Sequence, residues 1–266
     1  MHKIEFSNVC LIYKDNGLEY KAIQDMNFTV EAGEFVSLIG PSGCGKSSTL
    51  SVLAGLQTPT KGEFLVDGKK VNGPDKNRGV VFQHYSLFPW MTAIENVTFG
   101  IQQNHPNLTK DATRKLAEEN LRKVGLEGFF DKYPYQLSGG MQQRTAIART
   151  LAMAPDIMLM DEPFGALDAR NRIIMQDLLL EVLNKEKTPK TIVFVTHDID
   201  EAILLSDRIL FMDDKHIVKE INVPFGKNRR RDDIFTNKEF NDLRKELMNC
   251  FYRSIKEDLY CREAVS

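Results

Sequence analysis

Apolar and polar residues alternate through residues 3–36, and this period of two predicts antiparallel strands with one exposed face. The apolar positions are Ile4, Phe6, Val9, Leu11, Met26, Phe28 and Val30. Residues 35–39 then form a short apolar run, which is typical of a strand buried on both faces. This run leads directly into a glycine-rich segment, so the sequence predicts a strand followed by a tight loop.

Strand and helix patterns alternate in most of the remaining chain, and this order predicts a parallel sheet covered by helices. Strands are expected at residues 63–67, 80–82, 157–160, 191–195, 209–212 and 216–221, and helices at 46–56, 170–184 and 199–205. Residues 84–153 carry helical patterns at 110–124 and 139–153 and no strong strand signal. We therefore expect an α/β core with an inserted helical lobe.

Composition excludes several classes of protein. The 266 residues carry a net charge of −2, so no general basic field indicates nucleic-acid binding. Cys10, Cys44, Cys250 and Cys261 are far apart, which argues against a zinc site or a disulfide framework and favours reduced thiols. The N-terminus has no secretory pattern, and no apolar run reaches the roughly 18 residues that span a bilayer. A role at a membrane would therefore be that of a peripheral subunit.

The segment from Gly40 to Ser47 reads Gly-Pro-Ser-Gly-Cys-Gly-Lys-Ser and fits the phosphate-loop pattern G-x-x-x-x-G-K-[ST]. Between a strand and a helix, such a loop exposes backbone N–H groups, and the helix N-terminus adds positive potential. Lys46 is expected to reach the β- and γ-phosphates of ATP, and Ser47 to offer its hydroxyl to Mg²⁺. A chance glycine-rich turn is the alternative, which the flanking strand and helix disfavour.

Two acids end the apolar run at residues 157–160, at the carboxyl end of a predicted strand, where ligands bind in open α/β sheets. Asp161 is expected to hold Mg²⁺ through water. Glu162 is expected to be the general base that polarises the attacking water. The alternative reading is a pair of solvated surface acids, which the buried run before them and Pro163 after them make less attractive.

The string Leu137-Ser-Gly-Gly-Met-Gln-Gln-Arg144 lies between the phosphate loop and these acids. This order resembles the ATP-binding-cassette (ABC) ATPases over roughly residues 3 to 220. The resemblance implies a P-loop NTPase core with a parallel sheet, an N-terminal antiparallel β subdomain and an inserted α-helical subdomain. It places the ATPase domain at residues 1–223, with the helical subdomain at about 84–153, and a separate C-terminal segment at 224–266.

The resemblance also assigns further site residues. His197 corresponds to the switch histidine that contacts the γ-phosphate, and Gln83 to the glutamine that touches Mg²⁺ or the attacking water. Tyr13 corresponds to the aromatic residue that stacks on adenine, although a strand tyrosine is more often simple packing. The nucleotide-binding set is completed by the residues of the phosphate loop and its continuation: Gly40, Pro41, Ser42, Gly43, Cys44, Gly45, Lys46, Ser47 and Ser48.

Ser138 is a plausible N-cap of the helix expected at 139–153, so the helical lobe presents a second anion-binding helix end. In the family, Ser138, Gly139 and Gly140 would bind the ATP held by the phosphate loop of another protomer. The segment from Gly165 to Asp168 resembles the part that crosses this interface. We therefore expect a head-to-tail homodimer that ATP closes and hydrolysis opens.

Phe88, Pro89 and Trp90 follow Gln83 in a predicted loop, and exposed clusters of this kind usually mark a protein contact. This segment resembles the part of ABC ATPases that grips a membrane permease, within the nitrate/sulfonate/taurine importer group. The resemblance implies a peripheral subunit at the cytoplasmic face of the cell membrane, with a permease and a solute-binding protein as partners and no nucleic acid. A core anchor for the helical lobe is the other reading of the three residues.

Two other classes of function stay open at this point. One is a soluble ABC ATPase that acts in DNA repair or on ribosomes, although the long insertions, zinc cysteines or second cassette of such proteins are not seen. The other is a regulatory nucleotide sensor with no role in transport.

The C-terminal segment begins with a basic cluster at residues 227–231 and continues with one helical apolar stripe. The stripe consists of Phe240, Leu243, Leu247, Phe251 and Ile255, and we expect it to pack on the core.

Cys44 of the phosphate loop is expected to have a lowered thiol pKa, because it lies near a helix N-terminus.

Overall fold

The computed structural model describes residues 2–15, 17–186, 188–226 and 229–263, and for residues 257–263 only the backbone. The chain divides into two compact units. Unit 1 comprises Met1–Gly73 and Val193–Ser266, and unit 2 comprises Pro74–Ile192. Each unit is described by itself.

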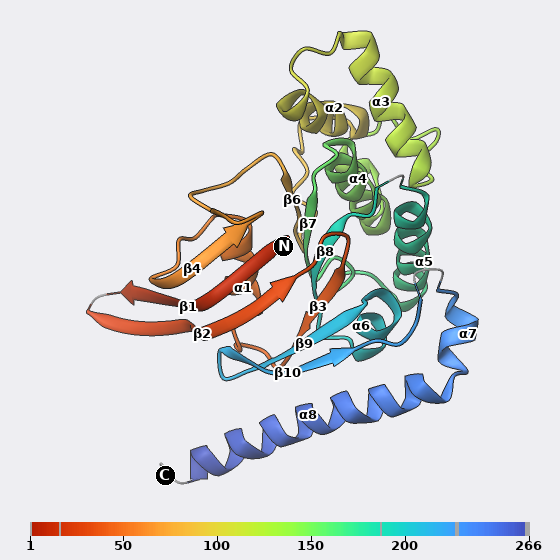
Figure 1. Cartoon of the computed structure of the whole chain (residues 1–266). Helices are drawn as coiled ribbons and strands as arrows, with labels where there is room; N and C mark the ends of the chain where they lie inside the picture. The colour runs from red at the N-terminus through yellow and green to blue at the C-terminus, as the bar shows by residue number, and fades with distance from the viewer. Residues whose placement is uncertain (1, 16, 187, 227–228, 264–266) are drawn as a thin grey trace. The chain divides into compact units, whose positions relative to one another are not determined.

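Unit 1 contains an antiparallel sheet in the order β2-β1-β4-β5 (Figure 1). Its strands are β1 (Ile4–Asp15), β2 (Leu18–Val30), β4 (Lys61–Val66) and β5 (Lys69–Lys70). The alternating residues Phe6, Phe28 and Phe64 pack on one buried face, with ring centroids 4.6 Å and 4.9 Å from that of Phe6. The predicted alternation breaks at Asn8, whose backbone is left-handed (φ 50°) and where the register shifts, so β1 carries a bulge.

Unit 1 also contains the strands β10-β9-β3-β8, in that order. They are β3 (Phe35–Ile39), β9 (Arg208–Asp213), β10 (His216–Asn222) and β8 (Thr191–Val195), whose first two residues belong to unit 2. β3 is parallel to β9, and all five of its residues are buried, as its short apolar sequence predicts, including the polar Ser37. Helix α1 (Lys46–Leu53) follows β3, and α6 (Ile199–Leu205) packs against β3.

Unit 2 pairs β6 (Arg78–Val81) in parallel with β7 (Ile157–Asp161). Its helices are α2 (Ala93–Asn104), α3 (Lys110–Lys123), α4 (Gly139–Ala152) and α5 (Ala169–Lys185), with the 3-10 turn η1 (Pro134–Gln136) before α4. Helices α2, α3 and α4 pack against one another (Figure 1). The sequence analysis missed α2, although Thr92 and Glu95 form its capping box: Thr92 Oγ1 accepts from Glu95 N, and Glu95 Oε2 accepts from Thr92 N.

The C-terminal segment forms α7 (Arg231–Phe235) and α8 (Lys238–Glu263), and α8 packs on α6 and β9 within unit 1. Phe240 and Leu247 of the predicted stripe are buried, but Ile255 is 51% exposed, so the stripe packs only in part. Lys227 of the basic cluster lies outside the described residues. Over the part of the chain that is described, the helices are too short or too polar to cross a lipid bilayer.

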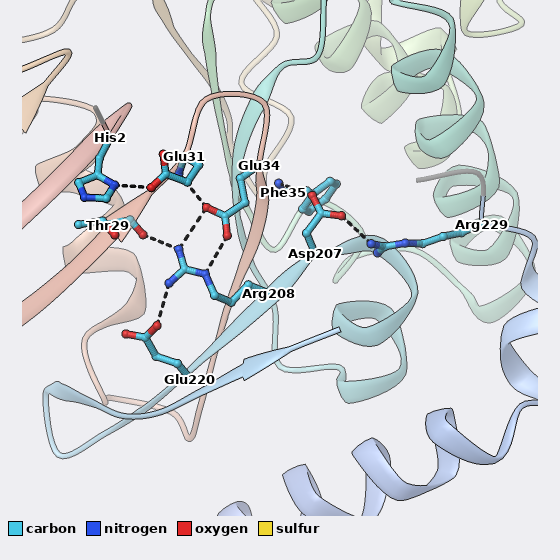
Figure 2. A network of polar contacts seen from close by, with 9 residues as sticks. All are labelled: His2, Thr29, Glu31, Glu34, Phe35, Asp207, Arg208, Glu220 and Arg229. Atoms are coloured by element: carbon cyan, nitrogen blue, oxygen red, sulfur yellow. Dashed lines mark hydrogen bonds and ion pairs between the residues drawn. The ribbon is translucent and has the colours of Figure 1, made fainter. Parts of the chain in front are cut away.

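A polar network fixes the start of β3 in unit 1 (Figure 2). Arg208 donates to both carboxylate oxygens of Glu34, at 2.7 and 3.1 Å, and to Glu220 at 2.7 Å. Asp207 joins two elements, because its carboxylate accepts from Phe35 N at 3.0 Å and from Arg229 at 2.6 Å.

Arg229 attaches the C-terminal segment to this network (Figure 2). Its side chain is only 2% exposed and also donates to the carbonyls of Leu204 and Ser206 at the end of α6. Burial lowers the pKa of the guanidinium, which stays charged because that pKa starts so high. A buried charge of this kind is stabilising only while its partners are in place.

We expect Arg229→Ala to lower the free energy of unfolding by about 3 kcal/mol, because it removes one partner of a buried ion pair and leaves buried carbonyls without a donor. Arg230, which is exposed, offers a matched control, and Arg230→Ala should change stability by no more than about 0.5 kcal/mol. Urea unfolding followed by circular dichroism measures both. Equal stability of the two variants would contradict the anchoring role of Arg229.

Candidate nucleotide site

The phosphate loop lies in unit 1, between the end of β3 and the start of α1. At two of its positions only glycine fits, because a neighbouring backbone carbonyl lies too close for a Cβ atom. A Cβ at Gly40 would lie 2.1 Å from the carbonyl oxygen of Met212, and a Cβ at Gly45 would lie 2.4 Å from that of Ala22. Gly45 is also left-handed (φ 102°) as the N-cap of α1, a conformation that glycine adopts at little cost.

Lys46 folds back over this loop. Its ammonium group donates to the carbonyl of Gly40 at 2.7 Å and to that of Pro41 at 2.8 Å, and the residue is 8% exposed. Thr49 reinforces the first turn of α1 by donating to the carbonyl of Gly45 at 2.9 Å. The loop therefore combines a fixed positive charge with a helix N-terminus, which is the arrangement that binds phosphate groups.

Cys44 behaves differently from the sequence prediction. Its pKa is raised rather than lowered. Cys44 is only 4% exposed, and the burial of its thiol raises the pKa by more than the positive charge of Lys46, 3.8 Å from Sγ, lowers it. The prediction of a lowered pKa was wrong because it counted the helix N-terminus and not the desolvation of the thiolate.

His197 is another predicted site residue that lies just beyond the end of a strand in unit 1. It comes two residues after the end of β8 and is exposed, and Thr196 N donates to the carbonyl of Leu38 in β3 at 3.3 Å. Because β3 and β8 are neighbours, His197 and Gly40 both lie just beyond the ends of adjacent strands. Tyr13 is in β1 opposite Tyr20, with 38% of its surface exposed.

The predicted catalytic residues of unit 2 follow its two parallel strands. Asp161 is the last residue of β7, and Glu162 comes next with a left-handed backbone (φ 42°). Gln83 follows β6, and its amide nitrogen lies 3.5 Å from Glu162 Oε2, within reach of a hydrogen bond. The structure therefore brings Gln83 and Glu162 together.

Ser138 caps α4 as predicted, because its hydroxyl accepts from Met141 N at 3.3 Å. The next residue, Gly139, leaves room for an aromatic ring, since a Cβ there would lie 2.9 Å from the hydroxyl oxygen of Tyr85. The first turn of α4 therefore contacts the segment that follows Gln83.

Asp168, the last residue of the segment predicted to cross the dimer interface, is the N-cap of α5. The hydrogen bonds that it accepts from Asn171 lower the pKa of its carboxyl group.

The sequence analysis missed Arg149, which holds the segment after Gln83. Its guanidinium donates to the carbonyl of Ser86 at 2.7 Å and to that of Tyr85 at 3.5 Å. Tyr85 and Ser86 are both left-handed (φ 47° and 49°), which is strained for residues other than glycine. No motif pointed to Arg149, because its partners are backbone carbonyls more than 60 positions away.

Comparison with known proteins shows the family to which this chain belongs. A family model described as ABC transporter matches residues 23–165. The chain belongs to the ABC transporter family. It is 48% identical to an ABC transporter ATP-binding protein of Methanocaldococcus jannaschii, over 97% of this chain and 94% of the relative.

Two further relatives have named solutes. The chain is 43% identical to the taurine import ATP-binding protein TauB of Roseobacter denitrificans, with 89% of each chain covered. It is 39% identical to the bicarbonate transport ATP-binding protein CmpD of Synechocystis, over 96% of this chain and 91% of the relative.

A solved structure has the same fold. The dimeric ATP-binding cassette MJ0796, in a post-hydrolysis state with ADP and Pi, matches with a TM-score of 0.75 and 38% identity, covering 84% of this chain and all of that one. The predicted ABC ATPase fold is confirmed, and this member of the family is an ATPase.

The raised pKa of Cys44 predicts slow alkylation of this ABC ATPase by iodoacetamide near pH 7.5, because only the thiolate reacts. We expect Cys44 to react more slowly than Cys250, which is only partly buried, and its alkylation to accelerate as the pH is raised. Mass spectrometry of each site over time measures the two rates. Faster labelling of Cys44 than of Cys250 at neutral pH would contradict the burial of its thiol.

Proposed function

We propose that this chain is the ATP-hydrolysing subunit of an importer that takes up a small solute through a separate membrane permease. The observation that carries the proposal is the likeness, over most of the chain, to ATP-binding subunits named for taurine and bicarbonate transport. The solute would then be a small anion or zwitterion such as nitrate, a sulfonate or taurine. The subunit would act at the cytoplasmic face of the membrane, in a complex that includes a solute-binding protein.

Each site residue has a role in this proposal. The amide groups of Gly40–Ser48 and the ammonium of Lys46 bind the phosphates of ATP, and Tyr13 stacks on the adenine ring. Glu162 accepts the proton of the attacking water, Gln83 orients that water, and His197 contacts the γ-phosphate. Catalysis of phosphoryl transfer depends mainly on such positioning and on charge stabilisation.

Mg²⁺ would be held by Ser47, Gln83 and Asp161. A hydroxyl, an amide oxygen and one carboxylate fit this ion, which prefers oxygen ligands and keeps several waters beside the phosphates of its substrate. The described residues contain no group of three or more His, Cys, Asp or Glu that could bind a metal ion. When bound, Mg²⁺ neutralises charge on the transferred phosphoryl group.

The chain is proposed to work as a head-to-tail homodimer. Support comes from the capped N-terminus of α4 at Ser138–Gly140, which is a second anion-binding helix end in the same polypeptide, in unit 2. The solved cassette with ADP and Pi that this chain resembles is itself dimeric. ATP would then be bound between the phosphate loop of one copy and Ser138–Gly140 of the other.

The aromatic cluster of Phe88, Trp90 and Phe99 in unit 2 is the proposed contact with the permease. Phe88 packs on the other two rings, with centroids 5.6 and 4.8 Å away, while Trp90 is 69% exposed. Asn96, fully buried, fixes the loop beneath them through hydrogen bonds to the backbone N–H and carbonyl of Phe88 and to the carbonyl of Met91. A rigid, exposed aromatic anchor of this kind is typical of a binding hot spot.

Glu162→Gln should reduce turnover by at least about 100-fold, because the amide keeps the shape of the side chain but cannot accept the proton. ATP-bound dimers should persist, since binding does not need the base. Phosphate release measures turnover, and size-exclusion chromatography with ATP measures dimers. Glu181→Gln, an exposed substitution on α5, is the control. Retained turnover would remove Glu162 from its role, and absence of ATP-dependent dimers would contradict the assembly.

Trp90→Ala should leave the ATPase activity of the isolated chain unchanged and should weaken binding to the permease by about 30-fold, the usual cost of losing a hot-spot side chain. Affinity purification of the tagged chain from detergent-solubilised membranes, with mass spectrometry of multi-span proteins, measures the binding. Tyr252→Ala removes an aromatic residue of similar exposure (57%) from α8 and serves as the control. Equal recovery of the permease by both variants would contradict the proposed contact.

A further inference from the structure

His197 is exposed, but the residues around it are fixed by a buried polar cluster in unit 1. Thr196, which precedes it, is 2% exposed, and Glu201, four residues after it, is 4% exposed. The Thr196 hydroxyl donates to Glu201 Oε2 at 2.5 Å and accepts from Asp198 N at 3.0 Å. The hydroxyl of the residue before His197 therefore binds the backbone N–H of the residue after it.

The same cluster is attached to the sheet and to the helix that follows. Thr196 N donates to the carbonyl of Leu38, two residues before Gly40 of the phosphate loop. Glu201 N donates to Asp198 Oδ1 at 3.1 Å, which caps the first turn of α6, and α6 packs against β3. The segment that carries His197 is thus held between the strand that ends in the phosphate loop and the helix that covers it.

Burial of the Glu201 carboxyl group needs an explanation beyond folding. A buried acid is costly unless hydrogen bonds compensate it, and an apolar side chain would fill the same place on α6 without that cost. The bond to Thr196 provides compensation and also fixes the direction in which the chain leaves β8. The carboxyl group of Glu201 therefore contributes to the local path of the chain as well as to the packing of α6.

We propose that Thr196 and Glu201 are positioning residues for His197, holding its backbone so that the imidazole meets the γ-phosphate of ATP without reorganisation. This inference rests on the role of His197 in the proposed function. A reacting group that is displaced by about 1 Å can lose about 100-fold in rate. Binding of ATP depends mainly on the phosphate loop, so loss of the positioning bond should act on kcat and not on KM.

The experiment compares Thr196→Val, which keeps the shape and removes the hydroxyl, with Thr196→Ser, which keeps a hydroxyl. We expect Thr196→Val to lower the kcat for ATP hydrolysis by about 10- to 100-fold with KM within about twofold, and Thr196→Ser to retain most of the turnover. Glu201→Gln should also retain turnover, because its amide oxygen can still accept from Thr196. Asp200→Asn removes the negative charge that pairs with Arg244 on the same turn of α6 and should leave kcat unchanged.

A double-mutant cycle with His197→Ala separates this proposal from the one on which it rests. If Thr196 acts through His197, Thr196→Val should cause no further loss of kcat in the His197→Ala background. Full turnover by His197→Ala alone would overturn the role of His197 in the proposed function. Loss of turnover in His197→Ala with normal turnover in Thr196→Val would overturn the positioning role and leave the proposed function intact.

A spectroscopic measurement keeps the test decisive if turnover is lost through instability. The imidazole ¹⁵N signals of His197, assigned by their absence in His197→Ala, report its orientation and surroundings in the folded chain. We expect them to shift in Thr196→Val and to stay in place in Thr196→Ser and Asp200→Asn. Unchanged His197 signals in folded Thr196→Val would overturn the proposal.

Discussion

The nucleotide site depends on the close approach of the phosphate loop to two neighbouring carbonyl groups. At Gly40 and Gly45 a Cβ would lie 2.1 and 2.4 Å from the oxygens of Met212 and Ala22, so the chain can follow this path only with glycine there. The path in turn places the carbonyls of Gly40 and Pro41 within hydrogen-bond distance of Lys46 and starts α1 with its amide groups toward the loop. The positive potential at the end of β3 follows from this backbone geometry and from one lysine.

Much of this fold could be predicted because buried parallel strands have a distinctive sequence. The apolar runs at 35–39, 157–160 and 191–195 match β3, β7 and β8 within one residue, since both faces of such strands are covered. Helix α2 was missed because its apolar positions follow directly on a loop with large apolar residues, although the capping box at Thr92 marks its start. Arg149 could not be predicted, because its partners are backbone carbonyls more than 60 positions away. Glu201 has partners nearby in the sequence, but the sequence does not show that its side chain is buried.

Backbone strain in unit 2 occurs in the segments that carry the predicted catalytic groups, and also at Ala154 after α4. Glu162, Tyr85 and Ser86 are left-handed residues other than glycine, each at a cost of about 1–3 kcal/mol. The strain persists because the surroundings determine it: Arg149 binds the carbonyls of Tyr85 and Ser86, and Gln83 reaches Glu162.

The C-terminal helix contacts two of the elements on which the phosphate loop and His197 depend. Ser254 donates to Asp213, the residue after Met212, whose carbonyl oxygen limits Gly40 to glycine. Arg244 donates to Asp200 in the first turn of α6. The Arg244–Asp200 ion pair is exposed and contributes little stability by itself, so burial of Phe240 and Leu247 and the edge-on contact of Phe251 with Phe211 must hold α8 in place. A change in the packing of α8 would therefore displace the backbone of β9, which lies against Gly40 of the phosphate loop, without contacting the phosphate loop itself.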